Sequence, residues 1–348
     1  MEAIYILEPG CYVRREGGAL NVVKKGRVID HIPAEGLKRL VLVGYVNLTG
    51  AVLDFLIRRR VETVFMTPTG RFRARLGIDE HRHVALRRDQ YQQLSDAAVA
   101  SRTARLIVAG KVRNMIRLLL LRGRQYDDDV LRSAAAGIKP LVNRLEKTGD
   151  MDRIRGLEGA ATRIYFQCFG RLIRNDGFTF NGRNRRPPLD PVNALLSFVY
   201  TLLTNEVTSA IQSCGLDPYM GSLHEISYGR PSLACDLVEE YRVFLGDRLV
   251  LGLINRKALD PDDFIFRQSS QTAYTDEKEM KARRPVEMRP PICRAFVAAY
   301  EQMMKRVVDR GPDQGKMTYR RLLLSQARAF GEYLQHPEKK YSPFVWNI

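Results

Sequence analysis

Residues 183–242 read RNRRPPLDPVNALLSFVYTLLTNEVTSAIQSCGLDPYMGSLHEISYGRPSLACDLVEEYR, and this stretch decides the fold of the larger part of the chain. A basic loop leads into a long apolar helix, which gives way to a Gly-Ser-Leu-His turn ending at His224. A second helix then carries Asp236, Glu239 and Glu240. A histidine that faces carboxylates on a helix offers the nitrogen and oxygen donors of a divalent-metal site. The stretch therefore predicts a helical domain with a candidate metal centre.

The composition points to a polyanionic partner. The chain has 348 residues, enough for two domains, with 45% hydrophobic and 27% charged residues, as in an ordinary globular protein. Its formal net charge of +17 is not ordinary, and nucleic acid is the commonest partner of so basic a chain. A membrane surface is the rival partner, but it calls for a basic amphipathic helix or a polybasic tail, and the sequence concentrates neither. A metal site in a basic protein favours a phosphodiester substrate, so we expect an enzyme that works on DNA.

The cysteines and the N-terminal residues predict a cytoplasmic protein. The five cysteines are scattered, odd in number and without a CxxC pair, which is typical of reduced thiols and not of a disulfide framework. The first residues, MEAIYILEPG, lack the basic and apolar regions of a signal peptide. No apolar stretch approaches the ~20 residues of a membrane span, so we expect no membrane partner.

The hydrophobic pattern predicts an α+β fold: a small β-rich domain over residues 1–90, including a hinge, and a larger, mostly α-helical catalytic domain over residues 91–348. Thr49 is the predicted cap of a helix over residues 50–59, and the polar residues 76–93 are the predicted hinge. The expected strands near the N-terminus are residues 3–7, 12–15, 20–23, 40–43 and 61–66.

Predictions near the C-terminus are less regular. Residues 264–266 and 272–275 form an expected β-hairpin, residues 283–291 an expected loop, and a final helix runs to about residue 334. An interruption resembling a hairpin is expected near residues 178–182. The tail over residues 341–348 either docks or is disordered, and the sequence leaves both open.

One helix within residues 92–332 carries its basic residues on a single face. At 100° per residue, five arginines fall together: Arg102, Arg105, Arg113, Arg117 and Arg124. A solvated face is the ordinary interpretation of such a stripe. Because no acidic residue is interspersed before Asp127, a phosphate-binding surface is an equal alternative.

The acidic residues and the histidine each have an ordinary interpretation as well. Glu158, in the small-residue segment GLEGAA, could be an exposed helical glutamate, and a lone His224 could be structural. Asp236 and Glu239 lie at i and i+3 of a helix that Ser232 is expected to cap, where acids stabilise the helix dipole. With Glu240 they form three acids that repel one another unless a cation or an arginine neutralises them.

Four segments in this order resemble one family, the CRISPR-associated endonuclease–integrase called Cas protein one. They are LEGAATRIYF, which contains Glu158, RRPPLDPVNALLSFVYTLL, the GSLH turn and DLVEEYR. Each piece alone is a weak signal, but their order and separation are specific. The resemblance covers nearly the whole chain, including the β-rich N-terminal domain.

The resemblance implies a set of roles. Glu158, His224 and Glu239 would ligate one catalytic Mn²⁺ or Mg²⁺, and Asp236 would be an auxiliary catalytic acid beside it. The substrate-facing loop and helix start would contribute Arg185, Arg186 and Asn193 to DNA binding. The family implies a homodimer, joined through its N-terminal domain to the small Cas protein two, that holds a prespacer DNA fragment. A 3′-hydroxyl of that fragment would attack a phosphodiester at the CRISPR repeat.

Two other functions remain open. A metal-dependent, structure-specific nuclease without integration needs the same metal and the same basic surface. A nucleic-acid-binding scaffold without catalysis instead predicts that Glu158, His224 and Glu239 lie apart, each paired to an arginine.

Overall fold

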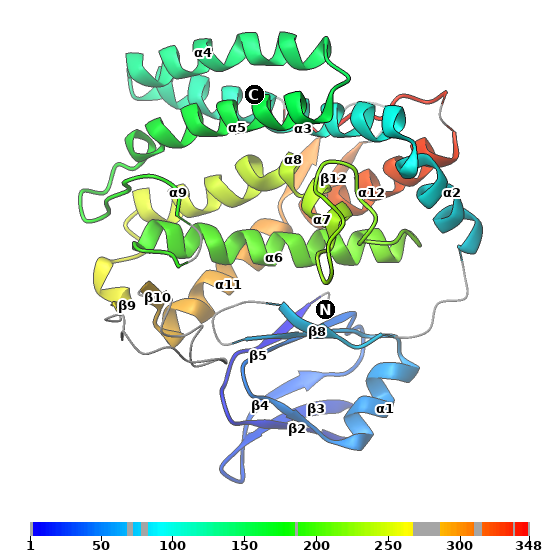
Figure 1. Ribbon diagram of the computed structural model, residues 1–348. Coiled ribbons are helices and arrows are strands. Elements are labelled where there is room, and N and C mark those ends of the chain that lie inside the picture. Colours follow the sequence, from blue (N-terminus) through cyan, green and yellow to red (C-terminus); the bar gives the residue numbers. More distant parts are fainter. Residues whose placement is uncertain are drawn as a thin grey trace, which may run out of the picture. The chain divides into compact units, whose positions relative to one another are not determined.

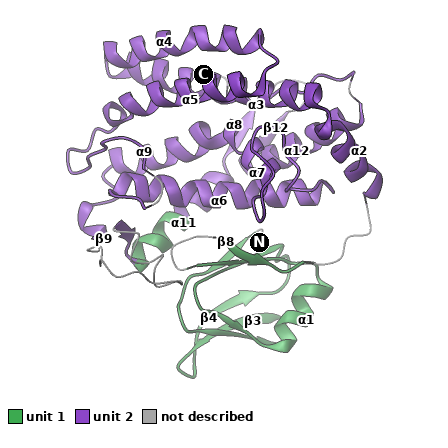
Figure 2. Ribbon diagram, in the orientation of Figure 1, with its two compact units in different colours: residues 1–81, 290–297 green, residues 82–289, 298–348 purple. Residues whose placement is uncertain are grey.

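The computed structural model describes residues 3–67, 72–77, 83–184, 187–266, 286–309, 315–336 and 338–346 (Figure 1). The chain divides into two compact units: Met1–His81 with Pro290–Val297, and Arg82–Arg289 with Ala298–Ile348 (Figure 2). The first unit is rich in strands and the second is mostly helical, which confirms the predicted α+β class. That residues 290–297 belong with the N-terminal unit was not expected from the sequence.

The described residues of the first unit form two four-stranded sheets, one complete helix and, over Pro290–Val297, the start of a second helix. The first sheet has the order β1-β5-β7-β8, with β1, β5 and β7 parallel and β8 antiparallel. The second has the order β4-β3-β2-β6, antiparallel except for the β2–β6 pair. The elements are β1 (Ile4–Ile6), β2 (Tyr12–Glu16), β3 (Ala19–Lys24), β4 (Arg27–Pro33), β5 (Arg39–Val43), β6 (Asn47–Leu48), α1 (Gly50–Arg58), β7 (Glu62–Met66) and β8 (Phe72–Arg75).

Burial explains which of these strands the sequence could predict. Residues Leu40 to Val43 of β5 are buried on both faces, as parallel strands are, and read as a continuous apolar run. Strand β4 is nearly all exposed and lies at a sheet edge, so its sequence lacks the apolar pattern from which a strand could be predicted. Thr49 does precede α1, but its hydroxyl makes no capping hydrogen bond, so the predicted cap is wrong in its chemistry.

The second unit is a bundle of helices, and its described residues also form two small strand pairs near its end. Its helices are α2 (Val84–Ser95), α3 (Ala97–Gln125), α4 (Asp129–Glu146), α5 (Met151–Cys168), α6 (Pro191–Ser213), α7 (Ser232–Leu237), α8 (Glu239–Tyr241), α9 (Arg248–Asn255) and α12 (Tyr319–Gln335). Helix α11 (Pro290–Met304) begins in the first unit and ends in the second. Short 3-10 turns cover Phe169–Leu172 and Pro261–Asp263, and Arg242–Asp247 form a π-helical turn. The strands are β9 (Phe264–Phe266), paired with β10 (Val286–Met288), and β11 (Val307–Asp309), paired with β12 (Lys316–Thr318).

Helix α6 is the core of this unit and lies beneath the site described below (Figure 1). Asp190 caps it by accepting a hydrogen bond from the Asn193 amide, and Pro191 occupies the first turn, where its missing N–H costs nothing. The helix is long and apolar enough to cross a membrane, but 72% of its most apolar window is buried within the protein, as in a core helix.

Several local predictions are corrected. The predicted hinge over residues 76–93 contains helix α2, because Leu94 and Gln90 pack inward. Strand β9 pairs with β10, so the expected loop at 283–291 includes a strand. Residues 272–275, the expected hairpin partner of 264–266, lie outside the described residues. Residues 178–182 contain no strand, and two helices, α11 and α12, stand in place of one final helix.

The C-terminal tail docks into the second unit. Tyr341, Phe344 and Trp346 are buried, and the Phe344 ring stacks on Tyr241 with centroids 5.3 Å apart. Glu240 accepts hydrogen bonds of 2.6 Å from the Tyr341 hydroxyl and the Phe344 amide. The tail is therefore part of the core that positions α8.

Candidate functional site

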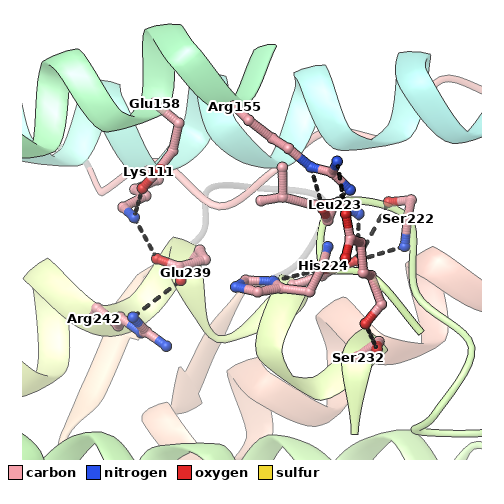
Figure 3. A network of polar contacts seen from close by, with 11 residues as sticks. Lys111, Arg155, Glu158, Ser222, Leu223, His224, Ser232, Glu239 and Arg242 are labelled. Atoms are coloured by element: carbon pink, nitrogen blue, oxygen red, sulfur yellow. Dashed lines mark hydrogen bonds and ion pairs between the residues drawn. The ribbon is translucent and has the colours of Figure 1, made fainter. Parts of the chain in front are cut away.

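Three helices bring two carboxylates and one ammonium together. Lys111 of α3 forms ion pairs with Glu158 of α5 and with Glu239 of α8, its Nζ lying 2.7 Å from Glu239 Oε2 (Figure 3). The Thr162 hydroxyl donates to Glu158 Oε1 at 2.9 Å from one turn along α5. Lys111 is only 5% exposed, so a buried ammonium holds the two acids in one cluster.

Glu239 is a buried carboxylate that stays ionised. Burial raises its pKa, but Arg242, 3.0 Å from Oε1, and Lys111 outweigh that effect and bring the pKa to about 2. Arg242 also lies over the Tyr200 ring, 5.0 Å from its centroid. The Oε2 atom lies 2.7 Å from Lys111 Nζ, so the ammonium is the cation that this oxygen contacts.

His224 is oriented by Asp236. Its Nδ1 lies 2.8 Å from Asp236 Oδ1, and since a carboxylate only accepts, Nδ1 carries the proton and Nε2 keeps its lone pair. Asp236 is fully buried and also accepts the main-chain amides of Ser222, Leu223 and His224, at 2.6, 2.9 and 3.0 Å. Figure 3 shows the His224 ring extending toward Glu239.

The GSLH turn fits closely against α7 because it begins with glycine. A Cβ atom on Gly221 would lie 2.6 Å from the Ser232 carbonyl carbon and 2.7 Å from Asp236 Oδ2. Ser232 does not cap α7 as predicted, because Pro231 holds the cap position and the Ser232 hydroxyl donates to the Glu225 carbonyl at 3.0 Å. The absence of a side chain at Gly221 thus lets the carboxylate of Asp236 reach the turn.

These side chains line a pocket of about 280 Å³. Arg155 of α5 donates to the Leu223 carbonyl at 3.1 and 3.2 Å, which joins the turn to α5. The pocket is lined by Lys111, Arg155, Glu158, Leu223, His224, Glu225, Arg230 and Glu239. Acids and cations therefore share one concave surface.

The arrangement fits a hard divalent cation in its donor set. Glu158, Glu239 and the Nε2 atom of His224 supply two carboxylates and an imidazole, which suit Mn²⁺ or Mg²⁺. As they stand, no three His, Cys, Asp or Glu side chains in the described part of the chain converge closely enough to share one ion. Lys111 occupies the space between the two glutamates. Glu158, His224 and Glu239 line one pocket, and Glu239 is also paired to an arginine, Arg242, as the scaffold alternative predicts.

Residues predicted to bind DNA have varied surroundings. Arg102 donates to the Tyr333 hydroxyl at 3.2 Å, Arg105 to the carbonyls of Glu146 and Thr148, and Arg113 pairs with Glu146 at 2.6 Å. Burial and then the nearby Arg113 lower the pKa of Arg117. Three of the five arginines of this face therefore contact elements that pack against α3.

Asn193 is fully buried, which gives no support to a direct contact with DNA. Its amide oxygen accepts from Arg183 at 2.6 Å and from the Asn184 main chain at 3.0 Å, so it holds the loop before α6. Arg185 and Arg186 lie outside the described residues.

The sequence prediction missed Lys111, Arg242 and Arg155. Lys111 stands in the apolar segment IVAGKVRNM, half a turn around α3 from Arg102. A lysine on the apolar face of a helix indicates an anionic partner in the protein interior, and this pattern is visible in the sequence.

The fold and the pocket define a two-domain α+β protein with an acid–histidine site in a basic helical domain. A family model described as "CRISPR associated protein Cas1" matches residues 4–314. The chain belongs to the Cas1 family.

Two curated relatives are similar in sequence to this chain over most of their length. A "CRISPR-associated endonuclease Cas1 1" of Chlorobaculum tepidum is 34% identical over 352 residues, covering 99% of this chain and 98% of the relative. A "CRISPR-associated endonuclease Cas1 2" of Rhodospirillum rubrum is 39% identical over 291 residues, 80% of this chain and 83% of the relative.

Solved structures share the fold. A Cas1 protein from Thermotoga maritima has a TM-score of 0.78 and 23% identity, covering 99% of each chain. A casposase bound to an integration product has a TM-score of 0.81 and 19% identity, covering 100% of this chain and 95% of the casposase.

Proposed function

We propose that this protein is a divalent-metal-dependent DNA endonuclease and integrase of CRISPR spacer acquisition. The observation that carries the proposal is the convergence of Glu158, His224 and Glu239 on one pocket of a strongly basic chain. The names of the curated relatives, CRISPR-associated endonucleases, support the nuclease activity. The fold shared with a casposase bound to an integration product is consistent with the joining reaction.

Mn²⁺ or Mg²⁺ would be held by Glu158, Glu239 and His224 Nε2, and would supply charge stabilisation at the phosphate. Asp236 acts behind the site, since its contacts go to His224 and to the turn. It fixes the tautomer and the direction of the imidazole. Arg242 keeps the Glu239 carboxylate charged in a buried place.

The basic residues of the pocket would bind the DNA backbone. Arg155 and Arg230 line it beside the acids, and their charge would hold the phosphates without reading base sequence. Arg102, Arg105, Arg113 and Arg117 would extend this surface along α3, with Arg185 and Arg186 in the loop before α6. We propose that the N-terminal unit serves dimerisation and partner contact.

The partners proposed are DNA, a second copy of the chain and the small Cas2 protein, all in the cytoplasm. One chain of a solved Cas6-RT-Cas1–Cas2 complex resembles this chain, with 24% identity and a TM-score of 0.81. The match covers 99% of this chain and 36% of that one. The proposed substrates are a prespacer fragment and the CRISPR repeat.

A joining assay tests the proposal. Wild type, Glu158→Ala and His224→Ala receive Mn²⁺, a supercoiled plasmid with a CRISPR repeat, a short duplex with free 3′ ends, and Cas2. Wild type is expected to join the duplex to the plasmid, and EDTA or either substitution is expected to abolish joining. Glu225→Ala is the matched control, because Glu225 lines the same pocket but its side chain is 76% exposed and pairs with Arg155, not with Lys111.

The products separate the remaining functions. Joined products support the integrase, whereas metal-dependent nicking without joining supports a nuclease alone. Products from both substituted proteins at the wild-type rate would show that the proposed ligands are wrong.

A further inference from the structure

Lys111 occupies the centre of the cluster that is proposed to bind metal. It reaches from α3 and contacts carboxylates on two other helices, Glu158 on α5 and Glu239 on α8. Among the described residues that line the pocket, it is the cation that contacts both acids. Its position between them is plain in Figure 3.

The charges of the cluster are balanced without a metal. Glu158 and Glu239 are each negative, and Lys111 and Arg242 are each positive. A divalent cation added to this group would leave it with two excess positive charges in a buried place, where like charges repel strongly. One of the two side chains must therefore withdraw when the metal enters.

Lys111 is the side chain that can leave. Its ammonium ends a flexible four-carbon stem and contacts the acids as a point charge. Arg242 is held on two sides, by Glu239 Oε1 at 3.0 Å in the same helical segment and by the Tyr200 ring at 5.0 Å. Arg242 also lies on the far side of Glu239 from Glu158 in Figure 3, whereas Lys111 lies between the two acids.

We propose that Lys111 is a built-in substitute cation: it neutralises Glu158 and Glu239 while the site is metal-free and competes with the divalent ion for the same two carboxylates. The inference rests on the proposed function. It makes Lys111 a positioning residue with two effects. First, it neutralises the repulsion between Glu158 and Glu239, which would otherwise push helices α5 and α8 apart. Second, it weakens metal binding, so that a higher concentration of free cation is needed to fill the site.

Metal binding to the full-length protein tests this directly. Mn²⁺ is titrated calorimetrically into wild type, Lys111→Met, Glu239→Gln and Lys139→Met. Methionine keeps most of the volume of the buried lysine stem and removes its charge. Lys139 is an exposed lysine of α4, so its substitution is the matched control. Lys111→Met is expected to bind Mn²⁺ about tenfold more tightly than wild type, to have a lower Tm without metal, and to regain Tm when Mn²⁺ is added.

A second measurement uses only the wild-type protein. The acetylation rate of Lys111 is followed by mass spectrometry with and without Mn²⁺. Because Lys111 is 5% exposed while it pairs with the acids, its acetylation is expected to be slow without metal and faster with it. The rate at Lys139 is expected to stay the same.

The outcomes separate the two proposals. If wild type binds Mn²⁺ and Glu239→Gln does not, but Lys111→Met binds no more tightly and Lys111 acetylation is unchanged by metal, the substitute-cation role is overturned and the metal site stands. If wild type and Glu239→Gln bind Mn²⁺ equally, or neither binds it, the metal site itself is overturned.

Discussion

Asp236 shows how much of a site can depend on a side chain that never touches its ligand. Five polar contacts converge on its carboxylate: three from consecutive main-chain amides, one from the Ser222 hydroxyl and one from His224 Nδ1. The alternative role, stabilisation of the helix dipole, does not fit, because Asp236 lies outside the first turn of α7. Here the carboxylate shapes a turn instead, and the turn presents the imidazole.

Replacing Asp236 by Asn should therefore damage stability as well as function. Asn would place an N–H donor against main-chain donors at a site with no solvent, at a cost of about 3 kcal/mol. Urea denaturation would measure it. Asp176→Asn is the control, since Asp176 is exposed and should lose little. Equal unfolding free energies for the two variants would contradict the role given to Asp236.

A second buried acid, Asp247, should make stability depend on pH. Burial raises its pKa to about 6, against hydrogen bonds from the hydroxyls of Tyr200 and Tyr165 at 2.5 and 2.7 Å that lower it. The folded protein thus binds this proton more tightly than the unfolded chain does. Its contribution to stability is complete below 3.8, the ordinary pKa of an aspartate, and is lost as the pH rises through about 6.

Asp247→Asn should remove that loss. The free energy of unfolding of the variant, relative to that of wild type, is expected to rise by about 2 kcal/mol between about pH 4.5 and about pH 7.5. Urea denaturation of both proteins at the two pH values gives the difference. Parallel pH profiles for wild type and variant would show that Asp247 ionises normally.

The candidate ligands could be identified from the sequence, but their surroundings could not. Glu158, His224 and Glu239 were assigned through their family motifs, and the structure gathers them in one pocket. Lys111 lies 47 residues before Glu158, and no spacing rule links residues on different helices across such a distance. The side chain that neutralises an acid is set by helix packing, which a single sequence does not display.

Helices α7 and α8 form one nearly continuous helical segment, called the rod below, and it directs neighbouring acidic side chains to different places. The rod starts at Ser232 and passes into the π-helical turn Arg242–Asp247. One consequence is that neighbouring acids diverge: Glu239 faces Lys111, whereas Glu240 holds the C-terminal tail. The prediction of three acids in one space is corrected, since only Glu239 belongs to the pocket.

The contact between this rod and the GSLH turn should fail if Gly221 acquires a side chain. Its Cβ would clash with the main chain of Leu233, 2.7 Å away at the amide nitrogen, which cannot rotate aside. Gly221→Ala is expected to lower the unfolding free energy by about 2 kcal/mol and to weaken Mn²⁺ binding through His224. Gly137→Ala, in the middle of α4 with open space around it, should instead stabilise by about 0.5–1 kcal/mol. A Gly221→Ala protein as stable as wild type would refute the close fit.

Predictions of elements succeeded where burial leaves a pattern in the sequence. Strands β5 and β7 bury apolar runs, and the predicted ranges 40–43 and 61–66 each differ from the observed ones by one residue. Helix α6 buries the long apolar stretch that predicts a helix there. Strand β4 and helix α2 were missed because both are mostly polar and are held by the elements beside them. The pairing of β9 with β10 joins residues about 20 positions apart in the sequence, so no short turn motif between them predicts it.

The two compact units carry different parts of the proposed activity. Every residue that lines the pocket falls in Arg82–Arg289, so the candidate site is built by the helical unit alone. That unit nevertheless needs the end of the chain, because Asn114 donates to the Phe344 carbonyl at 3.0 Å and accepts from the Trp346 amide at 3.1 Å.

Deleting residues 341–348 should therefore unfold much of the helical unit. The truncation exposes the surfaces under three buried aromatic side chains and leaves Glu240 without two hydrogen bonds, for a loss of at least about 4 kcal/mol. Thermal denaturation would record a large fall in Tm. Phe344→Leu, which keeps an apolar side chain in place, should fall much less. A truncated protein with the Tm of wild type would mean that the tail is dispensable.

The buried tail also sets the order of events when the protein is made. A ribosome releases the chain from its N-terminus, and domains made early can fold while synthesis continues. Phe344 is joined 104 residues after Glu240, whose carboxylate accepts a hydrogen bond from the Phe344 amide. The helical unit, with its pocket, therefore cannot complete its core until synthesis has passed Phe344.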